Sequence, residues 1–598
     1  MMTQVQGNTI PRPEHPRPDF QRETFCNLNG TWDFSFDNFG KESAGQVRFD
    51  RKITVPFVYQ CSASGIGTDE MHPVIWYRRS FTVPAEMQGK RVRLCFGAVD
   101  YHADVFVNGK CLGSHTGGYT PFSFDITDAL AAGESQELTV RVEDQPDCSQ
   151  PRGKQHWAPG LMGCWYTPSS GIWQTVYLEA VGENHLKRLA VTPDITRRMA
   201  NVEAFFDKFP AEDTRIELTL TFNGQKVKTL SVDVTDRIAS IPMDVVHRAA
   251  LDDVHYWTPE KPNLYDLKAT VYQQGTVIDS VSTYFGMRKI EVVKGEVYLN
   301  ATAYYQRLIL DQGYWPDTLL TPPSDEAIRR DIEQTKAYGF NGARKHQKIE
   351  DPRYYYWADK LGLIVWGEMP SCYAFNNEMI ENIGQTMQEF IARDYNHPSI
   401  ITWVPLNESW GVSEIYRNQR QQETGRMLYY LCKAADGTRL VSTNDGWEQV
   451  KTDICALHDY AAEKETLAAH FADRAHVEAH QCDWRPAFAQ GEQPTGEEAF
   501  MITEFGGIAF ANIGIQGELG GMETWGYSGK VEDEEAFFAR FEGVTEAAIA
   551  VPYSQGYCYT QLTDVMQEIN GLLTPERKSK VDVARVRAIN RNGSRSRI

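Results

Sequence analysis

Two glutamates follow apolar segments at points where the chain turns polar. Glu408 lies in PLNESW (405–410) and Glu504 lies in TEFGG (503–507). Two carboxylates that face each other across a pocket can cleave a glycosidic bond with retention, because one protonates the leaving oxygen while the other attacks the anomeric carbon. Their pKa values must differ, so that one is an acid and the other an anion at neutral pH. Either glutamate alone is typical of an N-cap or a surface charge, but the pair favours a catalytic site.

The elements that would position this pair begin after about residue 295, where strand-like and helix-like segments alternate. Ser324 is predicted to cap a helix that ends at Gly339. Eight segments are predicted as strands: 303–310, 340–344, 363–366, 400–406, 439–443, 454–458, 500–503 and 556–560. Eight such units over roughly 300 residues predict a (β/α)₈ TIM barrel, in which reactive groups stand at the C-terminal ends of strands. Glu408 would follow the fourth strand and Glu504 the seventh.

The part of the chain before the barrel is rich in short strands separated by turn signals. The alternating segment 102–107 runs into Asn108-Gly109, and 216–222 runs into Asn223-Gly224, which are both hairpin patterns. These patterns predict a β-sandwich followed by an immunoglobulin-like β-sandwich of about 105 residues. The predicted domains are therefore a jelly-roll β-sandwich at 1–182, an immunoglobulin-like β-sandwich at 183–290 and a catalytic (β/α)₈ barrel at 291–598.

Composition narrows the class of protein. The chain has 598 residues, 42% hydrophobic and 23% charged, which excludes wholesale disorder and a disulfide-stapled miniprotein. A formal charge of −20 disfavours nucleic acid and anionic membranes as partners. Eleven scattered cysteines without a CxxC motif are typical of free thiols in a reducing compartment. The polar, proline-rich start and the lack of a long apolar run favour a cytoplasmic location.

Several long motifs resemble glycoside hydrolase family 2 along essentially the whole chain. The segment NHPSIITW (396–403) leading to Asn407-Glu408 resembles the acid/base signature of that family. The segments 108–127 and SGIW (170–173) resemble its sugar-binding sandwich. The resemblance implies the same order of domains: jelly-roll sandwich, immunoglobulin-like sandwich and catalytic barrel.

The resemblance also implies roles for individual residues. Glu408 would be the acid/base and Glu504 the nucleophile. Asn407 would hydrogen-bond the sugar 2-hydroxyl, a contact that strengthens as the anomeric carbon becomes cationic. Tyr460 would donate a hydrogen bond to Glu504, although a core aromatic is the alternative. His346 would bind the sugar, with a structural histidine as the alternative.

Other candidates rest on position alone. Asp311 follows the first predicted strand and could hold sugar hydroxyls at the floor of the pocket, or be a turn residue. Trp447, after the fifth strand, is a candidate for sugar binding or for packing at the rim. Packing is the favoured prediction for two residues after the third strand, Trp366 and Glu368. Two residues of the sandwich are predicted to reach over the barrel mouth or to stay within the sandwich: Trp165 and Tyr166.

The identity of the substrate sugar stays open, because one motif of the sequence departs from the family pattern. Family glucuronidases carry an Asn-x-Lys pair that holds the substrate carboxylate, whereas INGLLT (569–574) lacks the lysine. The first prediction is therefore a retaining exo-β-glycosidase acting on β-galactosides. The alternative is a β-hexuronidase, acting on glucuronides or galacturonides, that holds the carboxylate with Arg344 and Lys345. Those two cations could instead form a barrel salt-bridge network.

A third reading, from a different class, is a non-catalytic carbohydrate-binding protein, against which the intact Asn407-Glu408 and Glu504 speak. The expected partner is a small-molecule or oligosaccharide glycoside. No cofactor and no metal are predicted: His476 and His480 lie on one helical face, but without the spacing of a zinc protease motif. Homo-oligomers occur in the family, but the sequence does not reveal one.

Overall fold

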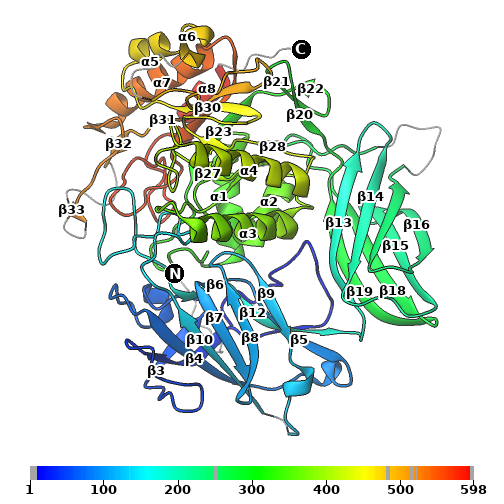
Figure 1. The fold of residues 1–598 in the computed structure, drawn as a ribbon. Coiled ribbons are helices and arrows are strands. Elements are labelled where there is room, and N and C mark those ends of the chain that lie inside the picture. Colours follow the sequence, from blue (N-terminus) through cyan, green and yellow to red (C-terminus); the bar gives the residue numbers. More distant parts are fainter. Residues whose placement is uncertain are drawn as a thin grey trace.

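The computed structural model describes residues 10–133, 135–246, 254–479, 485–511, 518–519 and 522–592. Figure 1 shows two β-sandwiches and a barrel surrounded by helices. The blue N-terminal sandwich lies below the barrel and the green second sandwich lies to its side. The predicted fold class of two sandwiches and a TIM barrel is confirmed.

The N-terminal sandwich consists of two antiparallel sheets. One has the order β1-β12-β5-β9 and the other β3-β2-β4-β10-β7-β8. Strand β7 buries every second side chain, and its hairpin with β8 turns at the predicted Asn108-Gly109. The bounds are β1 (Phe25–Asn27), β2 (Gly30–Phe36), β3 (Arg51–Val55), β4 (Val74–Phe81), β5 (Arg91–Phe96), β7 (His102–Val107), β8 (Lys110–Thr116), β9 (Phe122–Asp125), β10 (Gln136–Glu143) and β12 (Val176–Val181). A short pair joins β6 (Val99–Asp100) to β11 (Gly171–Ile172).

The second sandwich packs a three-stranded sheet, β13-β14-β17, against a four-stranded sheet, β16-β15-β18-β19. The alternating segment predicted at 216–222 lies in β15, whose buried side chains alternate with more exposed ones. Its hairpin with β16 turns at Asn223-Gly224. The bounds are β13 (Leu186–Asp194), β14 (Met199–Phe206), β15 (Thr214–Phe222), β16 (Gln225–Asp233), β17 (Ile238–Asp244), β18 (Tyr265–Gln273) and β19 (Thr276–Phe285).

The barrel contains eight parallel strands, and each overlaps one of the predicted segments. Their hydrogen-bonded order in the described chain is β28-β26-β25-β24-β23-β36-β31-β30, so the ring stays open between β28 and β30. The bounds are β23 (Gln306–Asp311), β24 (Gly342–Lys345), β25 (Ile364–Glu368), β26 (Ile400–Val404), β28 (Leu440–Val441), β30 (Ile454–His458), β31 (Ala499–Gly506) and β36 (Ser554–Thr560).

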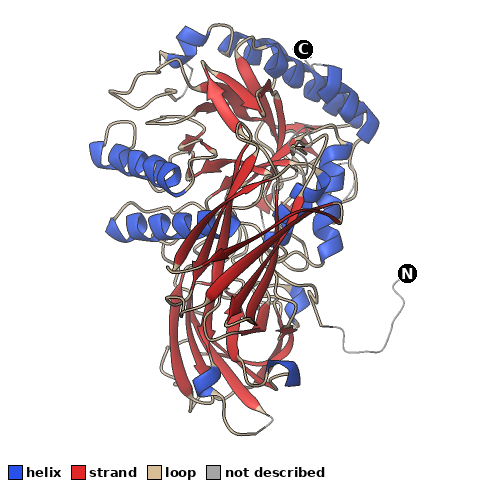
Figure 2. Cartoon of the chain, turned by 90° about the vertical axis from the view of Figure 1, so that its right-hand side faces the viewer, coloured by secondary structure: helices blue, strands red, loops and turns tan. Residues whose placement is uncertain are grey.

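Helices surround this ring, as Figure 2 shows in blue around the upper part of the molecule. Helix α1 begins as predicted, because the Oγ of Ser324 accepts a hydrogen bond from the Ala327 amide at 3.1 Å. The bounds are α1 (Asp325–Ala337), α2 (Pro352–Leu361), α3 (Asn377–Asp394), α4 (Gln419–Ala435), α5 (Lys464–His470), α6 (Arg474–Glu478), α7 (Glu534–Ala550) and α8 (Val583–Asn592). None of the helices in the described ranges is long and apolar enough to cross a bilayer.

Short strands complete the barrel. Two of them add apolar side chains to the barrel interior, β20 (Ile290–Val293) and β21 (Glu296–Leu299), and the exposed β22 (Thr302–Ala303) pairs with β21. Six others extend the C-terminal side or its loops: β27 (Leu406–Asn407), β29 (Asn444–Asp445), β32 (Ala509–Phe510), β33 (Glu518–Leu519), β34 (Met522–Glu523) and β35 (Lys530–Val531). Three single 3₁₀ turns lie in the first sandwich: η1 (Ser62–Ser64), η2 (Ala85–Met87) and η3 (Thr127–Ala129).

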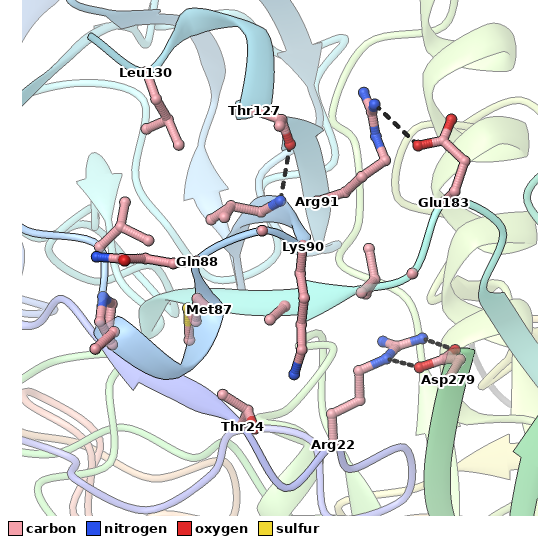
Figure 3. A pocket seen from close by; sticks show the side chains of 18 of the residues that line it. Arg22, Thr24, Met87, Gln88, Lys90, Arg91, Thr127, Leu130, Glu183 and Asp279 are labelled. Atoms are coloured by element: carbon pink, nitrogen blue, oxygen red, sulfur yellow. Dashed lines mark hydrogen bonds and ion pairs between the residues drawn. The ribbon is translucent and has the colours of Figure 1, made fainter. Parts of the chain in front are cut away.

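A groove of about 1200 Å³ separates the two sandwiches. Figure 3 shows two charged pairs at this groove, Arg22 with Asp279 and Arg91 with Glu183, and Lys90 between them. Among the residues that the structure describes, its lining includes no tryptophan or tyrosine on which a sugar could stack. The groove is therefore a junction between domains, and the chemistry predicted above belongs to the barrel.

Candidate active site

Glu408 and Glu504 both stand at the C-terminal side of the barrel. Glu504 lies near the end of β31, and Glu408 follows β27 directly. Glu408 and Ser409 have left-handed backbones, with φ of 51° and 58°, which are uncommon for residues with a side chain. The β29 strand holds this turn, since the Glu408 amide donates to the carbonyl of Asp445 at 2.8 Å. The turn directs the Glu408 side chain toward β30 and β31.

The two carboxylates converge on one imidazole. The Nδ1 atom of His458 lies 2.9 Å from Glu408 Oε1 and 3.6 Å from Glu504 Oε2. The nearest oxygen and nitrogen atoms of these three side chains all lie within 4.8 Å of one another. Carboxyl groups of retaining glycosidases are about 5–5.5 Å apart, whereas inverting enzymes need about 6.5–9.5 Å to admit a water molecule. The two carboxylates are therefore close enough to face one anomeric centre.

Glu504 is fixed by two donors. Arg344 pairs with its Oε1 atom, and the Tyr460 hydroxyl donates to its Oε2 atom, which is the contact predicted for that tyrosine. Tyr460 stacks on Tyr527 with ring centroids 4.3 Å apart. Gly507 makes room for this stack, because at φ 61° a Cβ atom there would lie 2.7 Å from Tyr527 and 3.0 Å from Tyr460. The glycine after the nucleophile candidate is thus a packing requirement.

Arg344 lies at the centre of the barrel mouth and is fully buried. Its Nη1 atom lies 2.9 Å from Asp445 and 3.2 Å from Glu368, and it donates to the Asn407 Oδ1 atom at 3.1 Å. Although burial lowers the pKa of Arg344, these carboxylates raise it well above its usual range. These contacts of the guanidinium group are with side chains of the protein. They agree with a salt-bridge network, which was the alternative to binding of a substrate carboxylate.

The pKa values of the ionisable groups in this cluster are shifted in different directions. Burial alone lowers the pKa of His458, but the charge of Glu504 and hydrogen bonds to Asp445 and Glu408 raise it to about 9, so the imidazole is protonated at neutral pH. Burial raises the pKa of Glu408, yet the hydrogen bond and charge of His458 outweigh it and place that pKa below its usual range. Burial raises the pKa of Glu368 to about 8, which leaves it largely protonated.

Three further predicted residues line the same cluster. The Nδ2 atom of Asn407 is buried and meets no acceptor in the described chain, so it is available to a sugar hydroxyl. The Nδ1 atom of His346 lies 2.9 Å from Glu368, and burial lowers the pKa of His346 well below its usual range. The ring of Trp447 lies edge-on to His458 at 5.7 Å.

Asp311 and Lys345 lie on the other side of the strands. Alternation along β24 sends Arg344 inward and Lys345 outward, where its Nζ atom is 2.8 Å from both Asp311 and Glu350. Lys348 also binds Glu350 at 2.8 Å. Asp311 is only 1% exposed and accepts from the Gly313 amide as well. The structure thus places both residues in a buried ion-pair network rather than at the carboxylate pair.

The N-terminal sandwich meets the barrel loops beside the site, through Trp165 and Tyr166, for which reaching over the barrel mouth and staying within the sandwich were the two alternatives. The ring of Trp165 lies 5.2 Å from Trp410 and 5.5 Å from Tyr373, both on barrel loops. The hydroxyl of Tyr166 accepts a hydrogen bond from Gln312 at 2.9 Å. This loop therefore covers part of the barrel mouth with aromatic side chains.

The same loop supplies Lys154, which the sequence did not single out. Gly153 before it packs tightly against the barrel, since a Cβ atom there would lie 2.1 Å from the carbonyl of Gln347. Burial lowers the pKa of Lys154, but Cys164 and Glu568, together with the two carboxylates of the candidate pair, raise it above its usual range. Lys154 therefore carries a positive charge in the electrostatic field of the site.

Two other residues of the site were missed, Asp445 and His458. A signal for both existed in the sequence, because each lies at or just after the end of a predicted strand: Asp445 comes two positions after 439–443, and His458 is the last residue of 454–458. Glu408, His458 and Glu504 are also residue types that bind metals, and they converge. Here Arg344 and protonated His458 already balance their charge, so the arrangement is an ion-pair cluster. His480 lies outside the described residues.

Comparison with known proteins identifies the family. The description "Glycosyl hydrolases family 2, sugar binding domain" matches residues 25–178, "Glycosyl hydrolases family 2" matches 184–288, and the TIM barrel domain of the same family matches 324–518. The chain belongs to glycoside hydrolase family 2. The three matches follow the order of the two sandwiches and the barrel.

Relatives within this family carry two kinds of name. A beta-galactosidase from Thermoanaerobacter pseudethanolicus is 27% identical over 409 residues, covering 66% of this chain and 52% of that protein. A beta-glucuronidase from Bacteroides fragilis is 26% identical over 494 residues, covering 75% of this chain and 66% of that protein. This chain spans about half the length of the first relatives that it matches.

Solved structures share the whole architecture. A β-glucuronidase from Ruminococcus gnavus in complex with an N1-substituted uronic isofagomine has a TM-score of 0.76 at 19% identity, with 97% of this chain and 100% of that chain covered. A β-glucuronidase from Bifidobacterium dentium complexed with coumarin-3-O-glucuronide has a TM-score of 0.76 at 20% identity, with 95% and 97% covered. At these identities the likeness establishes the fold.

Proposed function

We propose that this family 2 member is a retaining exo-β-glycosidase that works by double displacement. The observation that carries the proposal is the convergence of Glu408 and Glu504, whose carboxylate oxygens come within 4.8 Å of each other. Glu504 attacks the anomeric carbon while Glu408 protonates the leaving oxygen, which gives a glycosyl ester on Glu504. Water, deprotonated by Glu408, then releases the sugar.

The surroundings of each carboxylate fit these roles. Arg344 and Tyr460 each hold one carboxylate oxygen of Glu504, which aligns that side chain. Glu408 is the more accessible of the two, with 22% of its side chain exposed against 5% for Glu504, so it can reach a leaving group at the mouth. The Nδ2 atom of Asn407 is free to donate to the 2-hydroxyl, where hydrogen bonds strengthen in the transition state.

Covalent trapping tests this proposal. A 2,4-dinitrophenyl 2-deoxy-2-fluoro-β-glycoside should inactivate the protein and add one fluoroglycosyl group to Glu504, as read by peptide mass spectrometry. Glu504→Ala should abolish turnover and trapping, and leave thermal unfolding close to that of the wild type. Wild-type turnover in Glu504→Ala, or a label on another residue, would reject the assignment. Absence of any turnover across a panel of glycosides would favour the non-catalytic carbohydrate-binding alternative.

For the sugar, a neutral β-galactoside remains the first candidate. Three buried side chains beside the pocket offer paired hydrogen-bonding atoms suited to hydroxyl groups: Gln312, Gln561 and Glu568. Gln312 donates to Gln561 at 2.6 Å, and Gln561 donates to Glu568 at 3.3 Å. Burial raises the pKa of Glu568, so this carboxyl offers hydrogen bonds to hydroxyl groups but no positive charge to a substrate carboxylate. Relatives of this chain include proteins named beta-galactosidase.

A β-hexuronide is the second candidate, and Lys154 is the observation that favours it. Arg344 and Lys345 are occupied by carboxylates of the protein, so neither is available to a substrate carboxylate. The Lys154 ammonium has no carboxylate oxygen of the described chain within 4.0 Å, although its charge acts on Glu408 and Glu568. It could take the place of the missing lysine of the Asn-x-Lys pair. Relatives named beta-glucuronidase agree with this alternative.

Nitrophenyl β-D-galactopyranoside, β-D-glucuronide and β-D-galacturonide separate the two candidates. If a uronide is the substrate, Lys154→Met should raise its KM by about 10-fold or more, since a hydrogen bond to a charged group contributes about 1.5–3 kcal/mol. If a galactoside is the substrate, the wild type should hydrolyse it and show no turnover of the uronides. Lys464→Met, at an exposed ion pair with Glu546, is the matched control for loss of a lysine.

A further inference from the structure

In the resting site, the acid/base candidate Glu408 lacks the proton that it must donate to the leaving oxygen. Glu408 must carry a proton in order to donate it to the leaving oxygen, so a general acid is usually found with a raised pKa. The proton of His458 faces Glu408 instead, and it holds the pKa of Glu408 below its usual range in the resting site even though burial opposes this. The proton that Glu408 needs must therefore come from a neighbour.

The geometry of His458 singles it out as that neighbour. Its Nδ1 atom lies 2.9 Å from Glu408 Oε1, and its Nε2 atom lies 2.8 Å from Asp445 Oδ1. The imidazole side chain has no solvent exposure, and Trp447 packs edge-on against it. Gly446 lies so close that a Cβ atom there would be 3.0 Å from the ring. The ring is held in one orientation, with one nitrogen on each carboxylate.

Charged groups from every neighbouring element face this imidazole. Glu408 follows β27, Asp445 ends β29 and Glu504 lies on β31, and all three are acidic. Arg344 on β24 binds Asp445 and Glu504 from the opposite side. The other cation near the cluster is Lys154 from the sandwich, and His346 is neutral. Three acids and two fixed cations make a doubly protonated His458 the neutralising partner.

We propose that His458 stores the proton that Glu408 delivers to the glycosidic oxygen and takes the same proton back during hydrolysis of the glycosyl ester. The inference rests on the function proposed above and assigns a proton route to that site. His458 acts through Glu408, so it is a positioning residue for the proton and makes no contact with the substrate.

The proton balance closes over one turnover. When the glycoside displaces water from the site, the Nδ1 proton passes from His458 to Glu408 Oε1, and the imidazole keeps its Nε2 proton on Asp445. Glu408 gives that proton to the leaving oxygen as the glycosidic bond breaks and the Glu504 ester forms. In the second step a water molecule loses its proton to Glu408 as it attacks the anomeric carbon. Glu408 returns this proton to Nδ1, and the resting state is restored.

Two variants of His458 separate proton storage from simple hydrogen bonding. In His458→Asn, the side-chain amide reaches the Nδ1 position and can still donate to Glu408, but it cannot give up a proton. In His458→Gln, the amide reaches the Nε2 position on the Asp445 side. Both variants should lose about 10²-fold or more in kcat/KM for an alkyl or simple phenyl glycoside, the usual size of general acid catalysis. Hydrolysis of the 2,4-dinitrophenyl glycoside, which needs no acid, should fall by less than about three-fold.

The pH profile supplies a readout that a structural role would not move. In the wild type, the alkaline limb of kcat/KM reports loss of the one proton shared by Glu408 and His458. In His458→Asn that proton rests on Glu408 alone, so the alkaline limb should move to lower pH by at least one unit. An unmoved limb, or equal losses for good and poor leaving groups, would overturn the proposal.

The probes are aryl β-D-galactopyranosides, or aryl β-D-glucuronides if the wild type turns over only those. Trapping by the matching fluoroglycoside checks that Glu504 and the fold are intact in each variant, because this reaction needs no acid. If the wild type itself is not trapped, the function proposed above fails. If the wild type is trapped and His458→Asn behaves like it with phenyl glycosides, only the role of His458 fails.

Discussion

At the scale of single residues, Glu504 depends on donors of two kinds. Arg344 brings a full positive charge to one oxygen, and Tyr460 brings a neutral hydroxyl to the other. The hydroxyl of Tyr460 is also 3.3 Å from the Thr560 hydroxyl, which limits its rotation. The arginine therefore offers an opposite charge to Glu504, while the tyrosine sets the direction of its attacking oxygen.

Tyr460→Phe should consequently lower kcat without weakening the fold. The phenylalanine ring keeps the stack on Tyr527, but the hydrogen bond to Glu504 is lost. Hydrogen bonds to charged groups contribute about 1.5–3 kcal/mol, which corresponds to a loss of roughly 10- to 150-fold in kcat. Steady-state kinetics on an aryl glycoside and a thermal melt measure both quantities. An unchanged kcat would show that Arg344 alone aligns the carboxylate.

The candidate pair could be predicted from sequence because each glutamate comes directly after an apolar strand. Asp445 and His458 occupy similar positions, but their importance comes from contacts with Arg344 and Glu408, which lie 101 and 50 positions away. Asp311 illustrates the opposite case. Its position after the first strand is that of a ligand, but strand alternation along β24 points Lys345 toward it, and the two side chains form a buried ion pair.

At the scale of elements, the network outside β24 ties the strand ring to the loop before α2. Lys345 and Lys348 share the carboxylate of Glu350, and Lys345 also holds Asp311 at the end of β23. All four side chains are nearly or completely buried. Removing one member of such a network leaves an uncompensated charge away from water, which is costly.

Lys345→Met should therefore lower the free energy of unfolding by about 3–5 kcal/mol. The variant keeps the length of the side chain but leaves Asp311 without its cation. Urea denaturation followed by tryptophan fluorescence measures the change. Lys464→Met removes an exposed ion pair and should change stability by less than about 1 kcal/mol. Equal shifts in the two variants would contradict the role given to the buried network.

The same network predicts an acid sensitivity. Although burial raises the pKa of Glu350, Lys345 and Lys348 outweigh it and lower this pKa to about 2. The unfolded chain takes up a proton near the usual glutamate value, so the contribution of Glu350 to stability is complete above that pH and disappears as the pH falls toward 2. Glu350→Gln should show a smaller fall in melting temperature between pH 5 and pH 3, roughly the range in which the unfolded glutamate titrates.

The main elements could be predicted from the sequence because their signals are local. Ser324 caps α1, and apolar runs mark the barrel strands. The two-residue strands β27 and β29 have no periodicity to detect, yet they place Glu408 and Asp445 side by side. Elements of that length exist only because neighbouring chain segments pair with them, so a single sequence does not reveal them.

At the scale of the whole molecule, the first sandwich is part of the reaction site. Its loop brings Trp165 against Trp410, which follows the acid/base candidate by two positions. The loop is fastened to the barrel by hydrogen bonds from the Arg152 and Gly153 amides to the carbonyl of Ser371, at 2.9 and 3.0 Å. The contacts that join the two domains therefore also place aromatic side chains beside the candidate site.

Trp165→Ala should weaken binding of an aromatic aglycone while leaving the chemistry intact. Aromatic contacts contribute about 0.5–1.5 kcal/mol, so KM for a nitrophenyl glycoside should rise by roughly 2- to 12-fold with little change in kcat. A methyl glycoside should show a smaller change. Phe209→Ala, at a 71% exposed position of the second sandwich, is the matched control. A fall in kcat at constant KM would place Trp165 in the reacting geometry instead.

The position of Lys154 in the first domain has a consequence for how substrate preference can change within the family. The cation offered above as a partner for a substrate carboxylate lies 254 positions before Glu408 and 350 positions before Glu504, in a loop that folds with a different domain. Recombination that exchanged the amino-terminal domain between two such proteins would therefore transfer substrate preference and leave the bond-breaking machinery untouched. We expect chimeras built at the junction before β13 to inherit their choice of sugar from the donor of the first domain.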